Sequence, residues 1–388
     1  MCAEILNPPP ATVHPGLLRR RSVLKGAAVL GGAALLTACG GSGSSSPATT
    51  NPRGITVKDQ RGKTVVFDKP VTRVVTLPMP AASMLIAVDQ SAEHLVGMHD
   101  ASWIAVRDGI LGTIFPAALK VTHDVGDQEF VPNVESIVAL EPDVVIQWGD
   151  RGSGIIAPME NAGLTVLGLS YGTQDDVATW TRLFAMMLDK PQRAEAIISN
   201  IDDQLGEMTS LGESRPSTGP SILYFFQITE SINVAGSNSY NDSYINLVGG
   251  TNPAADVEGP SGIVGVDAEQ VLAWDPDIIL IGNFDVAMPA DVYDDPVWQN
   301  LSAVKARRVY KVPLGGYRWD PPGQESPLMW RWLSDIAFPA GKGAALRSQV
   351  VTDYQLLYDY QPSNAQLDMI LRIDANRESA NYRQFDAT

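Results

Sequence analysis

The chain has 388 residues and a formal net charge of −16, with 28 Lys and Arg residues against 44 Asp and Glu residues. This acidic balance argues against a nucleic-acid partner, because phosphate groups require a basic face. The length is sufficient for two lobes of ordinary size, each with its own hydrophobic core.

Residues 1–38 have the pattern of an export signal. Three consecutive arginines and Lys25 precede an uncharged run from Gly26 to Ala38, which is too short to span a bilayer as a permanent helix. The run ends in Leu-Thr-Ala-Cys39, which resembles the lipobox of bacterial lipoproteins, and the arginines resemble a twin-arginine motif. Export by the twin-arginine or the Sec route would leave the mature chain outside the cytoplasm, anchored to the cell membrane by lipid on Cys39.

The sequence contains two cysteines, Cys2 and Cys39. Removal of the leader takes Cys2 and acylation consumes Cys39, so we expect no disulfide in the mature chain and a large stabilising core. Residues 39–53 are rich in Gly, Ser, Thr and Pro, and we expect them to form a flexible tether.

A weak internal repeat predicts the fold class. Residues 134–146 and 268–280 share Glu, Ala, Pro and Asp at the same offsets, so that Glu135 corresponds to Glu269. In each copy, apolar residues at helical spacing lead to an acidic-Pro-Asp break and then to a continuous aliphatic run. Proline ends a helix, and an all-aliphatic run is typical of a strand buried on both faces of a parallel sheet. The repeat therefore predicts two α/β lobes with mainly parallel sheets.

We expect an N-terminal lobe at residues 54–175 and a C-terminal lobe at residues 217–388 that ends in a helical tail. Residues 176–213 show helical periodicity with a break at Lys190-Pro191. A helix of about twenty residues spans roughly 30 Å. This bridging helix region should therefore be a rigid connection between the lobes.

Several segments follow the order seen in class III solute-binding proteins of ABC importers, and the chain resembles that family from about residue 54 to residue 340. The segments that carry the resemblance are 55–63, 73–75, 95–97, 132–135, 142–146, 276–279, 295–298, 303–310 and 312–313. Members of the family capture ferric siderophores, haem and cobalamin in a cleft between two α/β lobes, and deliver them to a permease and its ATPase. The resemblance also implies that one acidic residue on each lobe pairs with arginines of the permease. Glu135 and Glu269 hold these positions, although each can simply begin a helix, where negative charge is favoured.

Ligands of open α/β sheets bind beyond the carboxyl ends of the strands. Residues that follow predicted strands, and the late loop 315–322, therefore supply the candidate ligand contacts. These contacts are Trp103, Trp148, Tyr171, Tyr240, Tyr317, Arg318 and Trp319. Aromatic rings can stack on a macrocycle or a catecholate, and an arginine can neutralise an anionic chelate, although each aromatic residue can equally belong to the core. The acidic loop 126–130 lies where some hydroxamate-siderophore binders carry an arginine, which argues against that ligand subclass.

The histidines that remain after processing are His94, His99 and His123, and their spacing fits no compact metal-binding motif. They could form a direct metal site with the help of Asp100 or Asp124, but surface or capping roles fit their spacing better. We therefore expect no cofactor, and we expect any metal to arrive inside a chelator.

An enzymatic alternative rests on Ser170, which occupies the central position of a G-x-S-x-G pattern after a predicted strand. A hydrolase of that type needs a histidine after the serine, and the sequence has none beyond His123. We therefore predict a monomeric, non-enzymatic binding lipoprotein of an ABC importer for an iron(III)-siderophore or a similar iron chelate. Cobalamin, haem or another metal chelate, and a sensor lipoprotein without a permease, are the alternatives.

Overall fold

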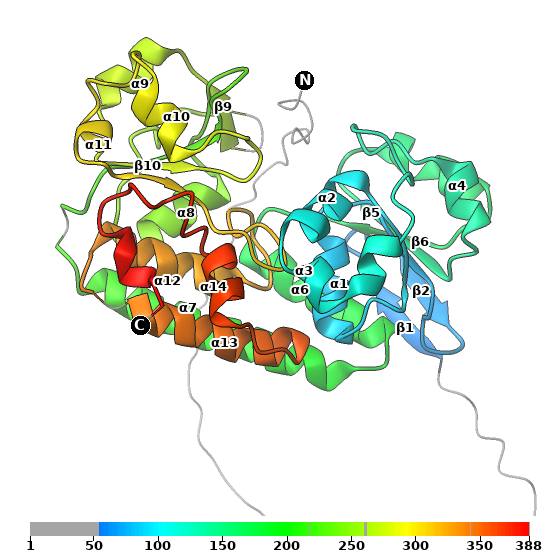
Figure 1. Cartoon of the computed structure of the whole chain (residues 1–388). Helices are drawn as coiled ribbons and strands as arrows, with labels where there is room; N and C mark the ends of the chain where they lie inside the picture. The colour runs from blue at the N-terminus through cyan, green and yellow to red at the C-terminus, as the bar shows by residue number, and fades with distance from the viewer. Residues whose placement is uncertain (1–53, 217, 260–261, 342, 388) are drawn as a thin grey trace, which may run out of the picture. The chain divides into compact units, whose positions relative to one another are not determined.

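The computed structural model describes residues 54–216, 218–259, 262–341 and 343–387. The predicted export signal, the lipidation site at Cys39 and the whole predicted tether lie outside the described residues. Figure 1 shows the described body as two α/β lobes, with helices packed along the base of both.

The N-terminal lobe is built on a four-stranded parallel sheet with strand order β4-β3-β5-β6. Every residue of β3, β5 and β6 is buried, which explains why these segments are mostly apolar and show no alternation. The strands are β3 (Val74–Thr76), β4 (Leu95–Met98), β5 (Val144–Trp148) and β6 (Val166–Leu169), preceded by the antiparallel hairpin of β1 (Ile55–Lys58) and β2 (Thr64–Phe67). Its helices before the bridge are α1 (Ala81–Asp89), α2 (Asp100–Asp108), α3 (Leu111–Ile114), η2 (Pro116–Lys120), α4 (Val134–Ala139), η3 (Ser153–Ile155) and α5 (Ala157–Asn161).

The C-terminal lobe has a five-stranded mixed sheet with strand order β11-β10-β7-β8-β9. Strands β7, β10 and β11 are parallel, as expected, whereas β8 and β9 form an antiparallel edge that was not predicted. The strands are β7 (Ile222–Gln227), β8 (Asn233–Ala235), β9 (Ile263–Gly265), β10 (Ile278–Ile281) and β11 (Val309–Lys311). The helices between them are α8 (Tyr240–Leu247), α9 (Ala268–Trp274), α10 (Pro289–Asp294) and α11 (Ser302–Lys305).

The sequence repeat is also a structural repeat, because α4 leads into β5 as α9 leads into β10. Each helix is followed by an acidic residue with a left-handed backbone, Glu141 (φ 45°) or Asp275 (φ 40°), and then by proline. The aspartate of each copy holds the neighbouring central strand: Asp143 accepts a backbone hydrogen bond from Arg73 at 3.0 Å, and Asp277 accepts one from Ser221 at 2.9 Å. The shared Pro and Asp therefore end the helix and set the register at which the next strand enters the sheet.

The long bridge consists of α6 (Gln174–Met187) and α7 (Pro191–Glu213), with the predicted break at Lys190-Pro191 between them. The lobes are also tied together by the C-terminal helices. Arg193 on α7 donates hydrogen bonds of 2.8 Å to the carbonyl oxygens of Ala87 in α1 and of Leu356, which belongs to the C-terminal helix α13 (Gly343–Tyr358). These C-terminal helices are α12 (Ser326–Ala337), α13 (Gly343–Tyr358), α14 (Asn364–Ile370) and η5 (Tyr382–Phe385).

The largest hydrophobic cluster contains residues of both lobes and of the bridge. It includes Val144 of β5, Leu280 of β10, Ile201 of α7 and Leu357 of α13. The two lobes therefore share one packed base, which limits how far they can move apart.

Candidate ligand-binding cleft

A cavity of about 520 Å³ lies between the two lobes. Its walls are formed by residues that follow strands or begin helices, as expected for an α/β sheet. On the N-terminal lobe the lining residues are Met79, His99, Asp100, Ala101, Ile104, His123, Asp124, Gly126, Asp127, Gln128 and Phe130. On the C-terminal lobe they are Phe226, Asn283, Phe284 and Arg318.

The C-terminal wall presents two stacked aromatic rings. Phe226 lies near the end of β7 and Phe284 follows β10, with ring centroids 4.8 Å apart and planes inclined by 25°. The guanidinium carbon of Arg318 lies 4.8 Å from the centroid of the Phe284 ring. A flat or apolar ligand face can stack on this wall, while an acceptor oxygen can bind the adjacent arginine.

A buried carboxylate positions this wall. Asp320 accepts hydrogen bonds from the Tyr224 hydroxyl at 2.6 Å and from the backbone N–H and side-chain amide of Asn283, both at 2.9 Å. Because β7, the turn after β10 and the Arg318 loop all meet at Asp320, their relative positions are defined before any ligand enters.

On the opposite wall, His99 is the N-terminal cap of α2. Its Nε2 atom lies 2.7 Å from the carbonyl oxygen of Asp127, and its Nδ1 atom accepts the backbone N–H of Ala101 at 3.1 Å. Burial lowers the pKa of His99, although the hydrogen bond to Asp127 opposes this shift. These two contacts require a neutral ring that is protonated at Nε2, so His99 donates to Asp127 and holds the 124–130 loop against α2.

At the rim of the same wall, His123 stacks on Trp103 with ring centroids 4.4 Å apart. The Nδ1 atom of His123 lies 2.9 Å from a carboxylate oxygen of Asp100. Trp103 is half-buried and its indole N–H donates to the carbonyl oxygen of Leu119 at 3.2 Å. Trp103, a predicted contact, therefore supports a residue that lines the cleft and is not itself among the lining residues.

Of the seven predicted contacts, only Arg318 lines the cavity. Trp148, Tyr317 and Trp319 are almost completely buried, with exposed fractions of 2%, 3% and 1%. Trp148 packs against Phe130 and Trp180, so it lies one ring behind the N-terminal wall. Glycines and polar residues flank these aromatics, but tertiary packing covers them.

Tyr171 and Tyr240 instead join the two lobes at the base of the cleft. The hydroxyl of Tyr171 donates to the carbonyl oxygen of Pro322, and the hydroxyl of Tyr240 donates to the side chain of Gln174 at 3.1 Å. The indole N–H of Trp330 donates to Tyr240 at 3.1 Å. These residues hold the lobes in place and are not among those that line the cavity.

The sequence reasoning missed the aromatic wall. Asn283 and Phe284 follow the aliphatic run of the second repeat copy, just as Gln147 and Trp148 end the first. Applying the strand-end rule to both copies would have identified them. Phe226 and Phe130 carried no comparable signal, because each looked like an ordinary apolar residue beside a strand or loop.

Glu135 and Glu269 occupy equivalent positions on the two lobes. Each is the second residue of its helix, after a capping residue: Asn133 accepts from Ser136 at 3.3 Å and Asp267 accepts from Gln270 at 2.7 Å. Both glutamates are exposed. In Figure 1, α4 and α9 lie at the upper ends of their respective lobes.

Ser170 lies directly after β6, but the next helix begins only at Gln174. A nucleophile elbow requires a tight turn from strand to helix at the serine. The backbone of Ser170 is held by Gln60 and Trp180 through hydrogen bonds of 2.8 Å. The local geometry therefore differs from that of a hydrolase elbow.

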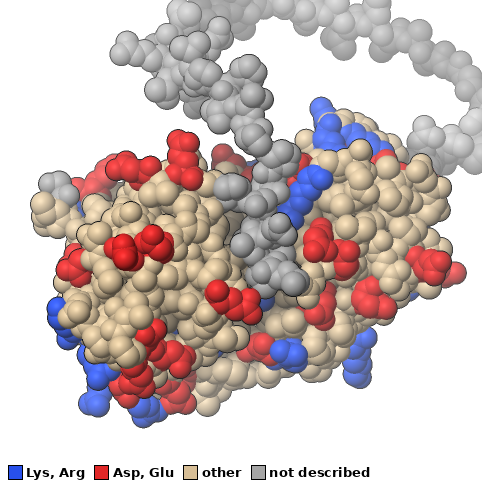
Figure 2. Space-filling model, turned by 90° about the horizontal axis from the view of Figure 1, so that it is seen from above, with Lys and Arg blue, Asp and Glu red and all other residues tan. Residues whose placement is uncertain are grey.

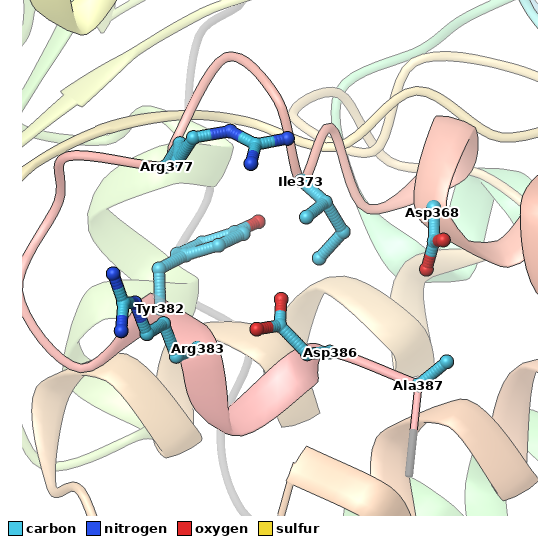
Figure 3. A pocket seen from close by; sticks show the side chains of 7 residues that line it. All are labelled: Asp368, Ile373, Arg377, Tyr382, Arg383, Asp386 and Ala387. Carbon is cyan, nitrogen blue, oxygen red and sulfur yellow. The ribbon is translucent and has the colours of Figure 1, made fainter.

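A second cavity, of about 330 Å³, lies among residues of the C-terminal segment (Figure 3). Figure 3 shows Arg377, Tyr382, Asp386 and Asp368 around this hollow. Asp368 also forms an ion pair with Arg347 at 2.6 Å. This cavity is formed by one lobe alone, so the interlobe cleft remains the better candidate for a ligand site.

Known proteins share this architecture. The sequence model of a family described as "Periplasmic binding protein" matches residues 125–314 of this chain. A periplasmic solute binding protein from Veillonella parvula has a crystal structure with a TM-score of 0.76 and 34% identity, covering 83% of this chain and 98% of that one. This chain is a periplasmic binding protein of class III. Periplasmic binding proteins of this class bind small ligands outside the cytoplasm and work with an ABC permease and its ATPase.

Two further relatives of this periplasmic binding protein carry ligand names. It is 26% identical over 264 residues to a cobalamin-binding protein of Halobacterium salinarum, covering 66% of this chain and 68% of the relative. It is 25% identical over 259 residues to the Fe(3+) dicitrate-binding protein FecB of Escherichia coli, covering 66% and 81%. Throughout the described part of the chain, no helix has both the length and the apolar character required to cross a bilayer.

Proposed function

We propose that this periplasmic binding protein captures an iron(III)-siderophore or a similar iron chelate and delivers it to an ABC permease. The observation that carries this proposal is the interlobe cavity of about 520 Å³, whose walls combine the Phe226–Phe284 pair with the Arg318 guanidinium. Small-molecule sites are typically about 300–1,000 Å³ and mostly apolar, with a few polar groups that orient the ligand. The likeness to the Fe(3+) dicitrate-binding protein supports iron.

Cobalamin is the second candidate, because the likeness to a cobalamin-binding protein is of similar strength. Isothermal titration calorimetry with ferric chelates, cyanocobalamin and haemin tests both. We expect micromolar or tighter binding of at least one ferric chelate, and weaker binding after Phe284→Ala. Binding of cyanocobalamin alone would transfer the assignment to the second candidate, and binding of haemin alone would exclude both.

The same proposal assigns Glu135 and Glu269 to permease docking. Two exposed carboxylates on separate lobes can make the interaction with the permease depend on the distance between the lobes, because both must contact the permease at the same time. Replacing both with arginine should abolish uptake in cells and leave ligand affinity unchanged. A matched control replaces two exposed glutamates of α7, Glu195 and Glu213, with arginine. Equal uptake by both double variants would contradict docking through the first pair, and unchanged copurification with the permease would do the same.

We further propose that lipid on Cys39 anchors the mature, monomeric protein to the outer face of the cell membrane. A Cys39→Ser variant should appear in the soluble extracytoplasmic fraction, because its only proposed anchor is lost. Retention of that variant in washed membranes would refute the anchor without affecting the assignment of the ligand.

A further inference from the structure

The charge of the cleft is asymmetric between its two walls. The lining residues of the N-terminal lobe include Asp100, Asp124 and Asp127, whereas the C-terminal wall contributes the guanidinium of Arg318. All three aspartates are exposed. Even with a protonated His123, the lining residues would retain a net negative charge.

Three other arginines near the cleft do not reverse this sign. Arg151 lies over the ring of the lining residue Phe130, 4.9 Å from its centroid, and the carboxylate of Asp150 faces it. Arg372 lies behind Asn283, to which it donates at 3.0 Å, and the carboxylates of Asp320 and Asp108 face it. Arg107 is paired with Asp108 at the surface. Each of these guanidinium charges therefore has a carboxylate close to it and adds little to the field inside the cavity.

The three wall aspartates keep acceptor capacity for a ligand. Asp127 uses one oxygen to accept the backbone N–H groups of Glu129 and Val131, at 3.0 Å and 2.9 Å. Asp100 contacts His123 through one oxygen, and Asp124 accepts from Ser136 at 3.3 Å. A carboxylate can accept several hydrogen bonds, so each wall aspartate can still bind an N–H group or a cation.

The opposite wall has the complementary chemistry. The hydrogen bonds of Arg318 to the Ala101 carbonyl and the Tyr317 hydroxyl, both 3.4 Å long, start from the same nitrogen, Nη1. Its Nη2 and Nε atoms can therefore donate to ligand oxygens beside the Phe226–Phe284 pair. A ligand fits both walls when it has acceptor oxygens and an apolar face on one side, and N–H groups or positive charge on the other.

We propose, on the basis of the function proposed above, that this cleft selects uncharged or cationic chelates and rejects strongly anionic ones. A trihydroxamate chelate has the required chemistry. Its three hydroxamate anions balance the charge of iron(III), so the iron centre is neutral, and the rest of the molecule offers amide or ammonium N–H groups. Figure 2 shows acidic side chains over both lobes on the face seen from above, so the surrounding field acts in the same direction. The selection reverses two expectations from the sequence: that Arg318 serves to neutralise an anionic ligand, and that the acidic loop 126–130 argues against hydroxamate ligands, because Asp127 of that loop lines the wall that favours an uncharged or cationic chelate.

The test uses chelates of known charge on the full-length protein, measured by calorimetry. The probes are ferrioxamine B, which is cationic, ferrichrome, which is uncharged, ferric enterobactin, which is strongly anionic, and uncharged cyanocobalamin. Ferric enterobactin should bind at least ~100-fold more weakly than the better of the two trihydroxamates, and the difference should shrink as salt rises from about 0.05 M to about 1 M. Equal or tighter binding of the anionic chelate would overturn the proposal.

Shape differs among these chelates, so the decisive comparison changes the wall and keeps the ligands. The triple variant Asp100→Asn, Asp124→Asn, Asp127→Asn keeps an acceptor oxygen at each position and removes the charges. In this variant, the ratio of the affinity for the better trihydroxamate to the affinity for ferric enterobactin should fall at least ~10-fold, because the anionic chelate binds more tightly and the cationic chelate more weakly. An unchanged ratio in a variant with wild-type circular dichroism would refute selection by this wall.

The matched control removes the same amount of charge from α7, through Asp202→Asn, Asp203→Asn and Glu207→Gln, all exposed. The control should keep the wild-type ratio, because net charge alone has a small effect at that distance. Binding of cyanocobalamin without any ferric chelate would refute the iron assignment but not selection for uncharged ligands. Binding of none of the probes would refute both.

Discussion

Glu325 offers a quantitative test of how the cleft loop is held. Its side chain is buried, and the carboxylate accepts hydrogen bonds from the Tyr358 hydroxyl at 2.5 Å, the Trp319 indole at 2.6 Å and the Gly316 backbone at 2.9 Å. Desolvation is the largest influence on this group, and it raises the pKa of Glu325 from 4.5 to about 7 despite these donors. The loop that Glu325 holds is the one that carries Arg318.

The raised pKa has a defined consequence for stability. A shift of this size corresponds to about 3 kcal/mol of differential interaction between the two protonation states. Because the folded protein binds this proton more tightly than the unfolded chain, the contribution is complete below about pH 4.5 and is lost as the pH rises through about 7. Glu325→Gln removes the titration while keeping a neutral side chain of similar size.

We therefore expect the unfolding free energy of Glu325→Gln, relative to wild type, to improve by about 3 kcal/mol between pH 4.5 and pH 8. Urea unfolding followed by circular dichroism at several pH values measures this difference. Other titrating groups, including Asp353, whose pKa burial raises to about 6, cancel in the comparison. The exposed Glu195→Gln should parallel wild type. A constant offset between Glu325→Gln and wild type over this range would refute the reasoning.

The remaining predictions concern the cap and the contact between the lobes. His99 should titrate with a pKa below 6.5 in NMR spectra of the folded protein, since burial disfavours its cation. The contribution of His99 to the free energy of unfolding should therefore fall as the pH drops below 6.5. A measured pKa above 6.5 would contradict the neutral cap. Gly109→Ala should destabilise the protein by about 1–3 kcal/mol in urea unfolding, because the new Cβ would lie 2.4 Å from the carbonyl oxygen of Gly315, which already accepts the backbone N–H of Ile110 at 3.0 Å in the contact between the lobes. Gly206→Ala is the matched control: its Cβ meets nothing within 4 Å, and it should stabilise α7 by about 0.5–1 kcal/mol. Equal stability of the two alanine variants would show that the loop containing Gly315 can move away from Gly109, and would contradict a fixed contact between the lobes.

The fold was predictable because its signals are local. The buried strands β3, β5, β7 and β10 are mostly apolar runs without alternation, and the Pro and Asp that follow α4 and α9 recur in both lobes. The antiparallel edge was not predictable, since β8 has three residues and β9 has three, too few to show a period. The packing of α13 against α1 also lacks a sequence signal, because it joins segments far apart in the chain.

A cavity lies where the sequence placed the ligand site, but of the predicted contacts only Arg318 lines it. Placing it at the strand ends between two lobes required only the order of helices and strands, which the residue pattern already specifies. The choice between a buried and a lining aromatic depends on what covers the ring. Trp319 donates to Glu325, and Trp148 lies behind Phe130, so neither reaches the cavity. The charge balance of the cleft likewise depends on folding, because Asp100, Asp127 and Arg318 are brought to the same cavity from separate lobes, and electrostatic interaction depends on distance in space.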